Sequence, residues 1–339
     1  MEPLLIIPVI LSFFVTLIAL PYWIRKAKQI GFVWEDMNKY GHPGNVASSG
    51  GIVVIMGFVL GVLSYIAIKT FILETNTTTV QIFALLTAVL IAAIIAITDD
   101  IFGWRHGGLP ARLRICLVFL AAVPLMVIDA GDSIVKLPFI GEVGLGLLYP
   151  LIILPIGVIG AATTFNFLAG YNGLEAGQGI LLLGSLSIVA FLTGSSWLAL
   201  IGLCMVVTLA AFLIFNRYPA QVFPGDVLTY PVGILLAIFA ILGNFEKIAI
   251  FFFIPYIAET FLKIRGGLKK QSFGKPLKDG SLDLPYDKIY GLEHLSISIL
   301  KKIKKSGKVY ETDVVYFIHG IQIIIIVIGF IIFKNSLLA

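Results

Sequence analysis

Long apolar stretches recur along the whole chain and limit its fold more than any other feature. A helix needs about 20 apolar residues to cross a hydrocarbon core roughly 30 Å thick. This chain of 339 residues is 59% hydrophobic and only 13% charged. It therefore predicts an all-α polytopic membrane protein, a single domain over residues 1–339 with about ten transmembrane helices. We expect these at 3–21, 51–73, 80–97, 114–128, 147–165, 177–192, 197–215, 227–242, 248–264 and 314–333.

The distribution of basic residues predicts which ends of these helices face the cytoplasm. Alternating spans put the loops 22–50, 98–113, 166–176, 216–226 and 265–313 on one side. These loops, with the adjacent Arg114 and Lys263, hold 20 of the 24 Lys and Arg residues. Because short cytoplasmic loops carry the excess of Lys and Arg in membrane proteins, this side should be cytoplasmic and both termini should lie outside.

The net charge of +5 does not indicate a nucleic-acid partner in such a chain, because basic residues in membrane proteins set orientation and attract anionic lipid. The partner that it indicates is the lipid bilayer. Cys116 and Cys204 both lie inside apolar segments, so we interpret them as inert buried thiols. We interpret residues 3–21 as an anchor, because they lack the basic start and small-residue cleavage site of a signal peptide.

A pair of acidic residues follows the third apolar stretch. Asp99 and Asp100 are adjacent, and Arg105, Arg112 and Arg114 come soon after them. Two carboxylates at a membrane boundary repel each other and are desolvated unless a cation compensates them. The pattern indicates either a catalytic acidic pair or a solvated helix end paired with the arginines.

Two further polar motifs lie on the same predicted side. Residues 165–177 hold Asn166, Asn172 and several glycines, which is typical of a tight turn whose backbone approaches a ligand. The alternative is a loop whose Asn and Gly residues serve only the turn. In the second motif, Phe223–Pro224–Gly225–Asp226 precedes an apolar stretch. Asp226 there is either a metal ligand or a helix N-cap.

The last predicted cytoplasmic loop, 265–313, is the longest. Lys278–Asp279–Gly280–Ser281 predicts a small hairpin. Further on, apolar residues at helical spacing beside several lysines predict a basic amphipathic helix on the membrane surface. Polar groups gathered at one interface favour an interfacial enzyme over a lipid or ion transporter, whose ionisable groups would lie near the membrane midplane.

In these motifs and their order the chain resembles the polyprenyl-phosphate N-acetylhexosamine-1-phosphate transferases of glycosyltransferase family 4. The resemblance runs nearly end to end and rests on five segments: Asp36–Met37–Asn38–Lys39, Ser49–Gly50–Gly51, Asp99–Asp100, the stretch from Asn166 to Gly177, and Phe223–Asp226. Asn172–Gly173–Leu174–Glu175 is closer to the branch that uses dolichyl phosphate than to the bacterial branch.

The resemblance implies a reaction and its site residues. It implies transfer of GlcNAc-1-phosphate, or a related HexNAc-1-phosphate, from UDP-GlcNAc to dolichyl or polyprenyl phosphate, with release of UMP. Asp99 and Asp100 match the catalytic pair. Asn166 and Asp226 match positions associated with Mg²⁺, for which Mn²⁺ can substitute. Asn172, Gly170, Phe223 and Met37 match the uridine site, and we assign Lys275, Lys270, Arg112 and Arg105 to the phosphates.

The resemblance leaves several properties open. A bacterial-type enzyme that uses undecaprenyl phosphate for cell-wall or surface polysaccharide is the alternative within the family. One-step and covalent mechanisms both remain, as does a homodimer. An archaeal cell membrane is favoured over an endoplasmic reticulum membrane, with the active site cytoplasmic in either case.

Overall fold

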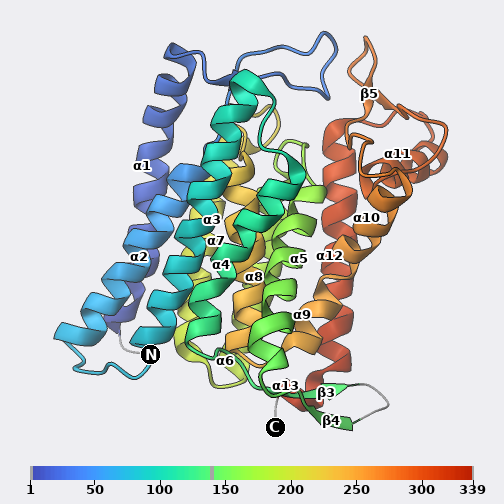
Figure 1. Cartoon of the computed structure of the whole chain (residues 1–339). Helices are drawn as coiled ribbons and strands as arrows, with labels where there is room; N and C mark the ends of the chain where they lie inside the picture. Colours follow the sequence, from blue (N-terminus) through green and yellow to red (C-terminus); the bar gives the residue numbers. More distant parts are fainter. Residues whose placement is uncertain (1–2, 138–140, 338–339) are drawn as a thin grey trace.

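The computed structural model describes residues 3–137 and 141–337. It is a bundle of long helices that run between two ends of the molecule (Figure 1). Within the described residues, seven helices are long and apolar enough to cross a membrane. They are α1 (Ile7–Gln29, after the short helix Pro3–Ile6), α2 (Gly51–Phe71), α3 (Thr79–His106), α5 (Leu154–Phe167, after the π-helical turn Tyr149–Ile153), α6 (Leu174–Leu192), α7 (Ser196–Asn216) and α12 (Glu311–Ile332).

The other three predicted spans are also helical but shorter. α4 (Ala111–Val127) and α8 (Asp226–Leu242) have 17 residues each. The ninth span is divided at Phe253 into α9 (Glu246–Phe252) and α10 (Ile254–Arg265). Pro255 lies in the first turn of α10, where the missing N–H costs no helical hydrogen bond. The structure thus shows a polytopic helical protein, and the number of ten spans stays a prediction.

The prediction that Asp99 and Asp100 lie in a loop was wrong. α3 continues past them to His106. The helix passes through Gly103 and ends only at Gly107 and Gly108, where φ is +91° and +75°. Such values end a helix without strain only at glycine. Asn166 likewise lies in the last turn of α5 rather than in the loop after it.

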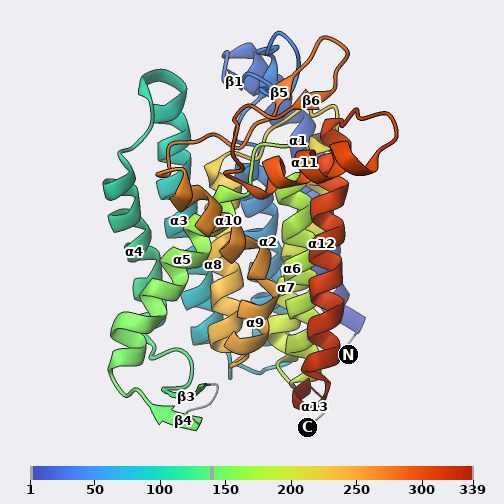
Figure 2. The ribbon, with the colours of Figure 1, turned by 90° about the vertical axis from the view of Figure 1, so that its right-hand side faces the viewer.

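The two ends of the bundle differ. Both termini lie at the lower end, with α13 (Lys334–Leu337) and the hairpin of β3 (Ile134–Leu137) and β4 (Gly141–Gly144) (Figures 1 and 2). The upper end carries the connection between α1 and α2, with β1 (Val33–Trp34) and β2 (Val46–Ala47), and the long connection between α10 and α12. The polar motifs of the sequence therefore meet at one end.

α8 forms the centre of the bundle. It packs against α3 and α5, and every residue from Val227 to Ile241 is buried. A helix that is apolar on all sides is buried in the interior of a larger assembly. Because α8 begins at Asp226, its central position places this carboxylate at the upper end of the core.

The long connection is itself folded. β5 (Lys275–Pro276) and β6 (Leu282–Asp283) pair on either side of the predicted turn, and α11 (Leu292–Ile303) follows. The apolar face of α11 packs against protein, because Leu292 and Ile297 are buried and α11 contacts α10 and α12. Ile303, at its last position, is exposed. Leu292 and Ile297 thus fix α11 on the bundle, and a location of α11 on the membrane surface stays a prediction.

Candidate active site

A cavity of about 620 Å³ opens at the upper end, among α3, α5, α8 and the connections around them. Seven of the predicted site residues line it: Met37, Asp99, Asp100, Asn166, Gly170, Phe223 and Asp226. They come from four segments that are far apart in the sequence. The cavity therefore brings together the acidic pair, both predicted metal ligands and three of the four predicted uridine contacts.

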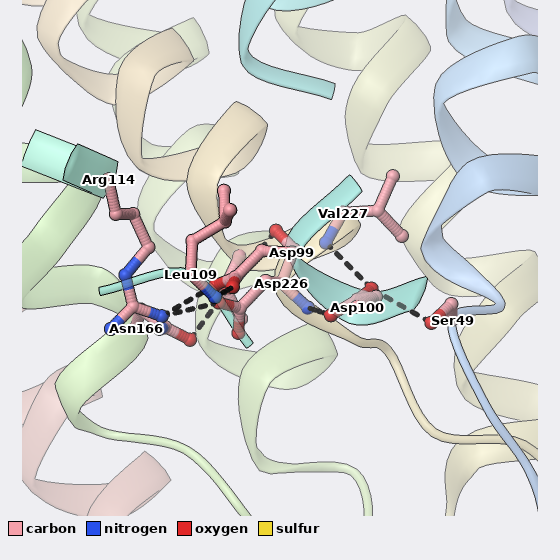
Figure 3. A network of polar contacts seen from close by, with 9 residues as sticks. Ser49, Asp99, Asp100, Leu109, Arg114, Asn166, Asp226 and Val227 are labelled. Carbon is pink, nitrogen blue, oxygen red and sulfur yellow. Dashed lines mark hydrogen bonds and ion pairs between the residues drawn. The ribbon is translucent and has the colours of Figure 1, made fainter. Parts of the chain in front are cut away.

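Asp100 binds the N-terminus of α8 (Figure 3). Its carboxylate accepts the backbone N–H groups of Asp226 at 2.9 Å and of Val227 at 3.3 Å. The first N–H groups of a helix have no partner within the helix and carry partial positive charge. The Ser49 hydroxyl donates a third bond to Asp100, at 2.8 Å. Asp100 thus caps α8 from a neighbouring helix, and Asp226, the first residue of α8, is not its N-cap.

Gly225 allows this approach. Its φ is +70°, and a Cβ atom there would lie 2.3 Å from Asp100 Oδ2 and 2.9 Å from the Ser49 Cα atom. Gly50 and Gly51 meet the same segment: their N–H groups donate to the carbonyls of Phe223 and Pro224, at 2.9 Å each. The Ser49–Gly50–Gly51 and Pro224–Gly225–Asp226 motifs are therefore two halves of one close contact between α2 and α8.

Arg114 connects Asp99 with Asp226. Its Nη1 atom lies 2.7 Å from Asp99 Oδ2 and 3.2 Å from Asp226 Oδ2. The other oxygen of Asp99 accepts the backbone N–H of Leu109 at 2.5 Å. Both ion pairs use the same nitrogen, and Arg114 lines the cavity. The remaining N–H groups of the guanidinium give it a fork suited to phosphate oxygens.

Asn166 lies beside this network and points toward it (Figure 3). Its side-chain oxygen accepts a 2.8 Å bond from the hydroxyl of Thr229, one turn after Asp226 on α8. This bond turns the amide toward the cavity that Asp226 also lines. A carboxylate and an amide oxygen are the hard donors that Mg²⁺ prefers, with substrate phosphates and water completing its shell.

The two oxygen donors of Asp226 and Asn166 therefore suit a Mg²⁺ site whose coordination shell is completed by substrate phosphates and water. The described part of the chain contains no cluster of three or more His, Cys, Asp or Glu side chains that could hold an ion by itself. In phosphoryl-transfer enzymes, Mg²⁺ is rarely held by protein side chains alone. The ion keeps several waters and binds one or two carboxylates together with the substrate phosphates. Asp226 and Asn166 fit that pattern.

The other end of the cavity is built by three connections. Asn38 donates to the Gly170 carbonyl at 2.8 Å and accepts the Gly274 N–H at 3.1 Å. Gly170 has a φ of +105°, and its N–H donates to Glu175 at 2.7 Å. Phe273, from the connection between α10 and α12, completes the wall, as does Phe223. Aromatic rings beside exposed backbone suit a planar base.

Asn172 lies behind this wall and not on it. Its side-chain N–H₂ group donates to Glu311 at 3.0 Å and to Asp36 at 3.2 Å, and its backbone N–H donates to Glu311 at 2.7 Å. Asn172 is buried, whereas Asp36 lines the cavity. In this structure Asn172 orients Asp36, and direct contact with a base stays a prediction.

The basic residues expected to bind phosphates lie elsewhere. Lys275, Lys270 and Arg112 are exposed and do not line the cavity. The Lys270 ammonium lies 4.6 Å from the ring centre of Tyr286. The side chain of Arg105 is outside the described residues. Among the described side chains, Arg114 is the cation that pairs with Asp99 and Asp226. Its signal in the sequence was an arginine at the start of an apolar stretch, 15 residues after Asp99.

The chain is similar to known glycosyltransferases. The model of the family "Glycosyl transferase family 4" matches residues 82–244. This range runs from the first turn of α3 to just past the end of α8 and contains Asp99, Asp100 and Asp226. A relative from Saccharolobus solfataricus, named "Putative UDP-N-acetylglucosamine--dolichyl-phosphate N-acetylglucosaminephosphotransferase", is 35% identical over 96% of this chain and 95% of its own.

More distant relatives come from other domains of life. The UDP-N-acetylglucosamine--dolichyl-phosphate N-acetylglucosaminephosphotransferase of Dictyostelium discoideum is 28% identical over 68% of this chain and 64% of its own. The "Probable undecaprenyl-phosphate N-acetylglucosaminyl 1-phosphate transferase" of Bacillus subtilis is 26% identical over 81% and 75%. Since the Saccharolobus relative is similar along nearly its whole length, and the family model matches the helices that carry the cavity, this chain is a member of glycosyl transferase family 4.

Proposed function

We propose that this protein transfers N-acetylglucosamine-1-phosphate from UDP-GlcNAc to dolichyl or a related polyprenyl phosphate, the first step of lipid-linked oligosaccharide assembly for N-glycosylation. The observation that carries the proposal is the convergence of Asp99, Asp226 and Arg114 in one cavity at the end of apolar helices. A diphosphate and a lipid phosphate can meet there while the prenyl chain stays in the bilayer. The names of the archaeal and eukaryotic relatives support this substrate pair.

The reaction needs alignment more than acid–base chemistry. An oxygen of the lipid phosphate attacks the β-phosphorus of UDP-GlcNAc, forming a new P–O–P linkage. The bond between the β-phosphorus and the bridging oxygen breaks, and UMP leaves with that electron pair. Because the second pKa of a phosphate monoester is near 6, the attacking oxygen is already largely ionised at neutral pH.

The residues of this chain then have distinct tasks. Arg114 would bind phosphate oxygens as the negative charge redistributes, and Asp99 holds its guanidinium in place. Asp100 holds the start of α8, and so Asp226, in register with α3. Asp226 and Asn166 would hold Mg²⁺, or Mn²⁺ in its place, which when bound neutralises charge on the diphosphate.

We place the cavity at the cytoplasmic face of the membrane, archaeal plasma membrane or endoplasmic reticulum. The support is the charge distribution: the end of the bundle that carries the cavity also carries most of the Lys and Arg residues, and this excess marks cytoplasmic loops.

The test is UMP release by the purified protein in detergent with UDP-GlcNAc, Mg²⁺ and dolichyl phosphate, together with detection of the GlcNAc-diphospho-lipid. We expect both products in equal amounts, no release without the lipid, loss of release in excess EDTA, and recovery with Mg²⁺ or Mn²⁺. Full release in EDTA would overturn the metal assignment, and absence of the lipid product would overturn the transfer.

The same assay with undecaprenyl phosphate decides the acceptor. The Bacillus relative, named for that lipid, makes this the relevant competitor. Since both lipids present the same phosphate, discrimination must come from the prenyl chain. Faster turnover with undecaprenyl phosphate would favour the bacterial-type function.

A further inference from the structure

The segment Ser272–Phe273–Gly274 forms one wall of the cavity but belongs to the connection between α10 and α12. Phe273 lines the cavity, and its ring lies so close to Gly170 that a Cβ atom on Gly170 would be 2.6 Å from it. A displacement of this segment would change the cavity where the nucleotide end of the substrate is expected. What holds the segment therefore affects substrate binding.

Groups on both sides hold the segment. Asn38 accepts the Gly274 N–H from the side of the α1–α2 connection. From the other side, the buried Lys263 of α10 donates to the Ser272 hydroxyl. His294 of α11 lies with Nε2 at 3.4 Å from the Phe273 carbonyl oxygen. The position of the Ser272–Phe273–Gly274 segment therefore depends on how α10 and α11 are held together.

Two buried carboxyl groups lie at that helix contact. Glu259 of α10 and Glu293 of α11 are both 0% exposed. Glu259 pairs with Lys263 at 3.3 Å and accepts the Leu292 N–H at 2.5 Å. Among the described residues neither oxygen of Glu293 has a hydrogen-bond partner. Both carboxyl groups reach the same point, because a Cβ atom on Gly291 would be 2.5 Å from Glu293 and 3.1 Å from Glu259.

The charges of this cluster do not balance if both groups are ionised. Two carboxylates would face the single ammonium of Lys263, leaving one surplus negative charge in a buried site, which is strongly unfavourable. The other titratable groups nearby are Tyr256 of α10, Tyr171 and Glu175 beside Gly170, Glu311 of α12 and His294 of α11. None of them adds a permanent positive charge. One retained proton restores the balance and gives Glu293 an O–H donor for Glu259.

We propose that Glu293 stays protonated at neutral pH and is a positioning residue, which joins α11 to α10 through Glu259 and so leaves Lys263 free to hold Ser272 and Phe273 at the cavity. Loss of the proton would draw Lys263 toward the carboxylates and loosen the segment. This inference rests on the proposed transfer reaction, whose substrate the segment would contact.

The pKa of Glu293 supports this role. Burial, and then the neighbouring Glu259, raises the pKa of Glu293 well above its usual range, against the lowering effect of Lys263. A carboxyl group whose pKa is raised on folding favours the folded arrangement below that pKa. The contribution is lost as the pH rises through the raised value. The segment should therefore loosen on the alkaline side.

The test is the KM for UDP-GlcNAc, measured by UMP release between pH 7 and pH 10, in the wild type, Glu293→Gln and Glu74→Gln. Glu74 is exposed and serves as the matched control, because the connection between α2 and α3, to which it belongs, lies at the end of the bundle opposite to α11. In the wild type and the control, KM should rise with pH while kcat changes less. Above the pKa of Glu293 the rise approaches about tenfold per pH unit, because KM scales inversely with the fraction of protein that is competent to bind. Gln is neutral at every pH, so Glu293→Gln should abolish this rise.

A rise of KM in Glu293→Gln equal to that of the wild type would overturn the proposal. If this variant fails to fold, hydrogen exchange of the wild type decides: protection of the Gly274 amide, corrected for the intrinsic rate, should fall with pH. Constant protection would equally refute the role of Glu293. Absence of UMP release from the wild type at every pH would instead count against the proposed reaction.

Discussion

Asp100 and Asp226 are joined by one contact but have different tasks. Asp100 accepts hydrogen bonds from two backbone N–H groups and from Ser49. The Asp226 carboxylate instead faces Arg114 and the cavity. The same substitution at the two positions should therefore have different effects on stability.

We expect Asp100→Asn and Asp226→Asn each to lose most UMP release. Only Asp100→Asn should also lower the free energy of unfolding, by about 1 kcal/mol, because an amide N–H₂ group then faces backbone donors. Thermal unfolding in detergent, beside the activity assay, measures both effects. Full activity in Asp226→Asn would contradict its role as a metal ligand, because Asn keeps the shape and removes only the charge.

Arg114 offers a second test at the scale of one side chain. Arg114→Met should lower kcat by about 10²–10³-fold, in the range found when a donor to transition-state charge is removed. Arg114→Lys keeps the charge but loses the planar fork, so it should retain more activity than Met. Equal kcat for Met and wild type would show that Arg114 only balances the charge of Asp99 and Asp226.

At the scale of helices, glycine contacts set where α2 and α8 meet. A Cβ atom on Gly51 would lie 2.6 Å from the Leu228 backbone nitrogen and 2.7 Å from the Pro224 carbonyl oxygen. Neither backbone atom can move without shifting the start of α8. The position of Asp226 therefore depends on a residue that has no side chain.

Gly51→Ala should destabilise the protein by about 1–3 kcal/mol through overpacking, and UMP release should fall with it. Gly320→Ala on α12 is the matched control, since a Cβ atom there meets nothing within 4 Å. Thermal unfolding and kcat of both variants give the comparison. An unchanged kcat in a folded Gly51→Ala variant would refute the dependence of Asp226 on this contact.

At the scale of the whole molecule, the α1–α2 connection and the start of α8, which line the cavity, lie at the end of the bundle opposite to the two termini (Figure 1). This arrangement agrees with the predicted alternation of spans, which places both termini on one side. The number of spans, the cytoplasmic location of the cavity and self-association into a homodimer stay predictions.

Single cysteines would test the orientation. The two positions are tested in a Cys116→Ser background. Lys278→Cys lies in the turn between β5 and β6, at the upper end of the bundle, and Glu74→Cys lies in the connection between α2 and α3, at the lower end. A membrane-impermeant maleimide should label Glu74→Cys on intact cells, and Lys278→Cys only in inverted vesicles. Labelling of Lys278→Cys on intact cells would reverse the proposed orientation.

The sequence alone determined the helical segments and the motifs that form the site. Apolar length and charge asymmetry are local properties, so they predicted the segments and their sides. The chemistry of Asp and Asn side chains likewise indicated which residues suit a divalent ion and phosphates. Helix ends were less accurate, because Asp99 and Asp100 are stabilised inside α3 by partners from outside that helix, among them Arg114 of α4 and the first N–H groups of α8.

Only the tertiary structure decided how the polar residues pair. Asp226 had two interpretations, as N-cap or ligand, until Asp100 was found to supply the cap from another helix. Arg114 rather than the predicted lysines reaches the carboxylates, and Asn172 faces Asp36 and Glu311 behind the cavity wall. Apart from the pairing of Asp99 with Arg114, these pairings join residues more than 100 positions apart. The direction in which each side chain points depends on how the helices pack. No local pattern contains that information.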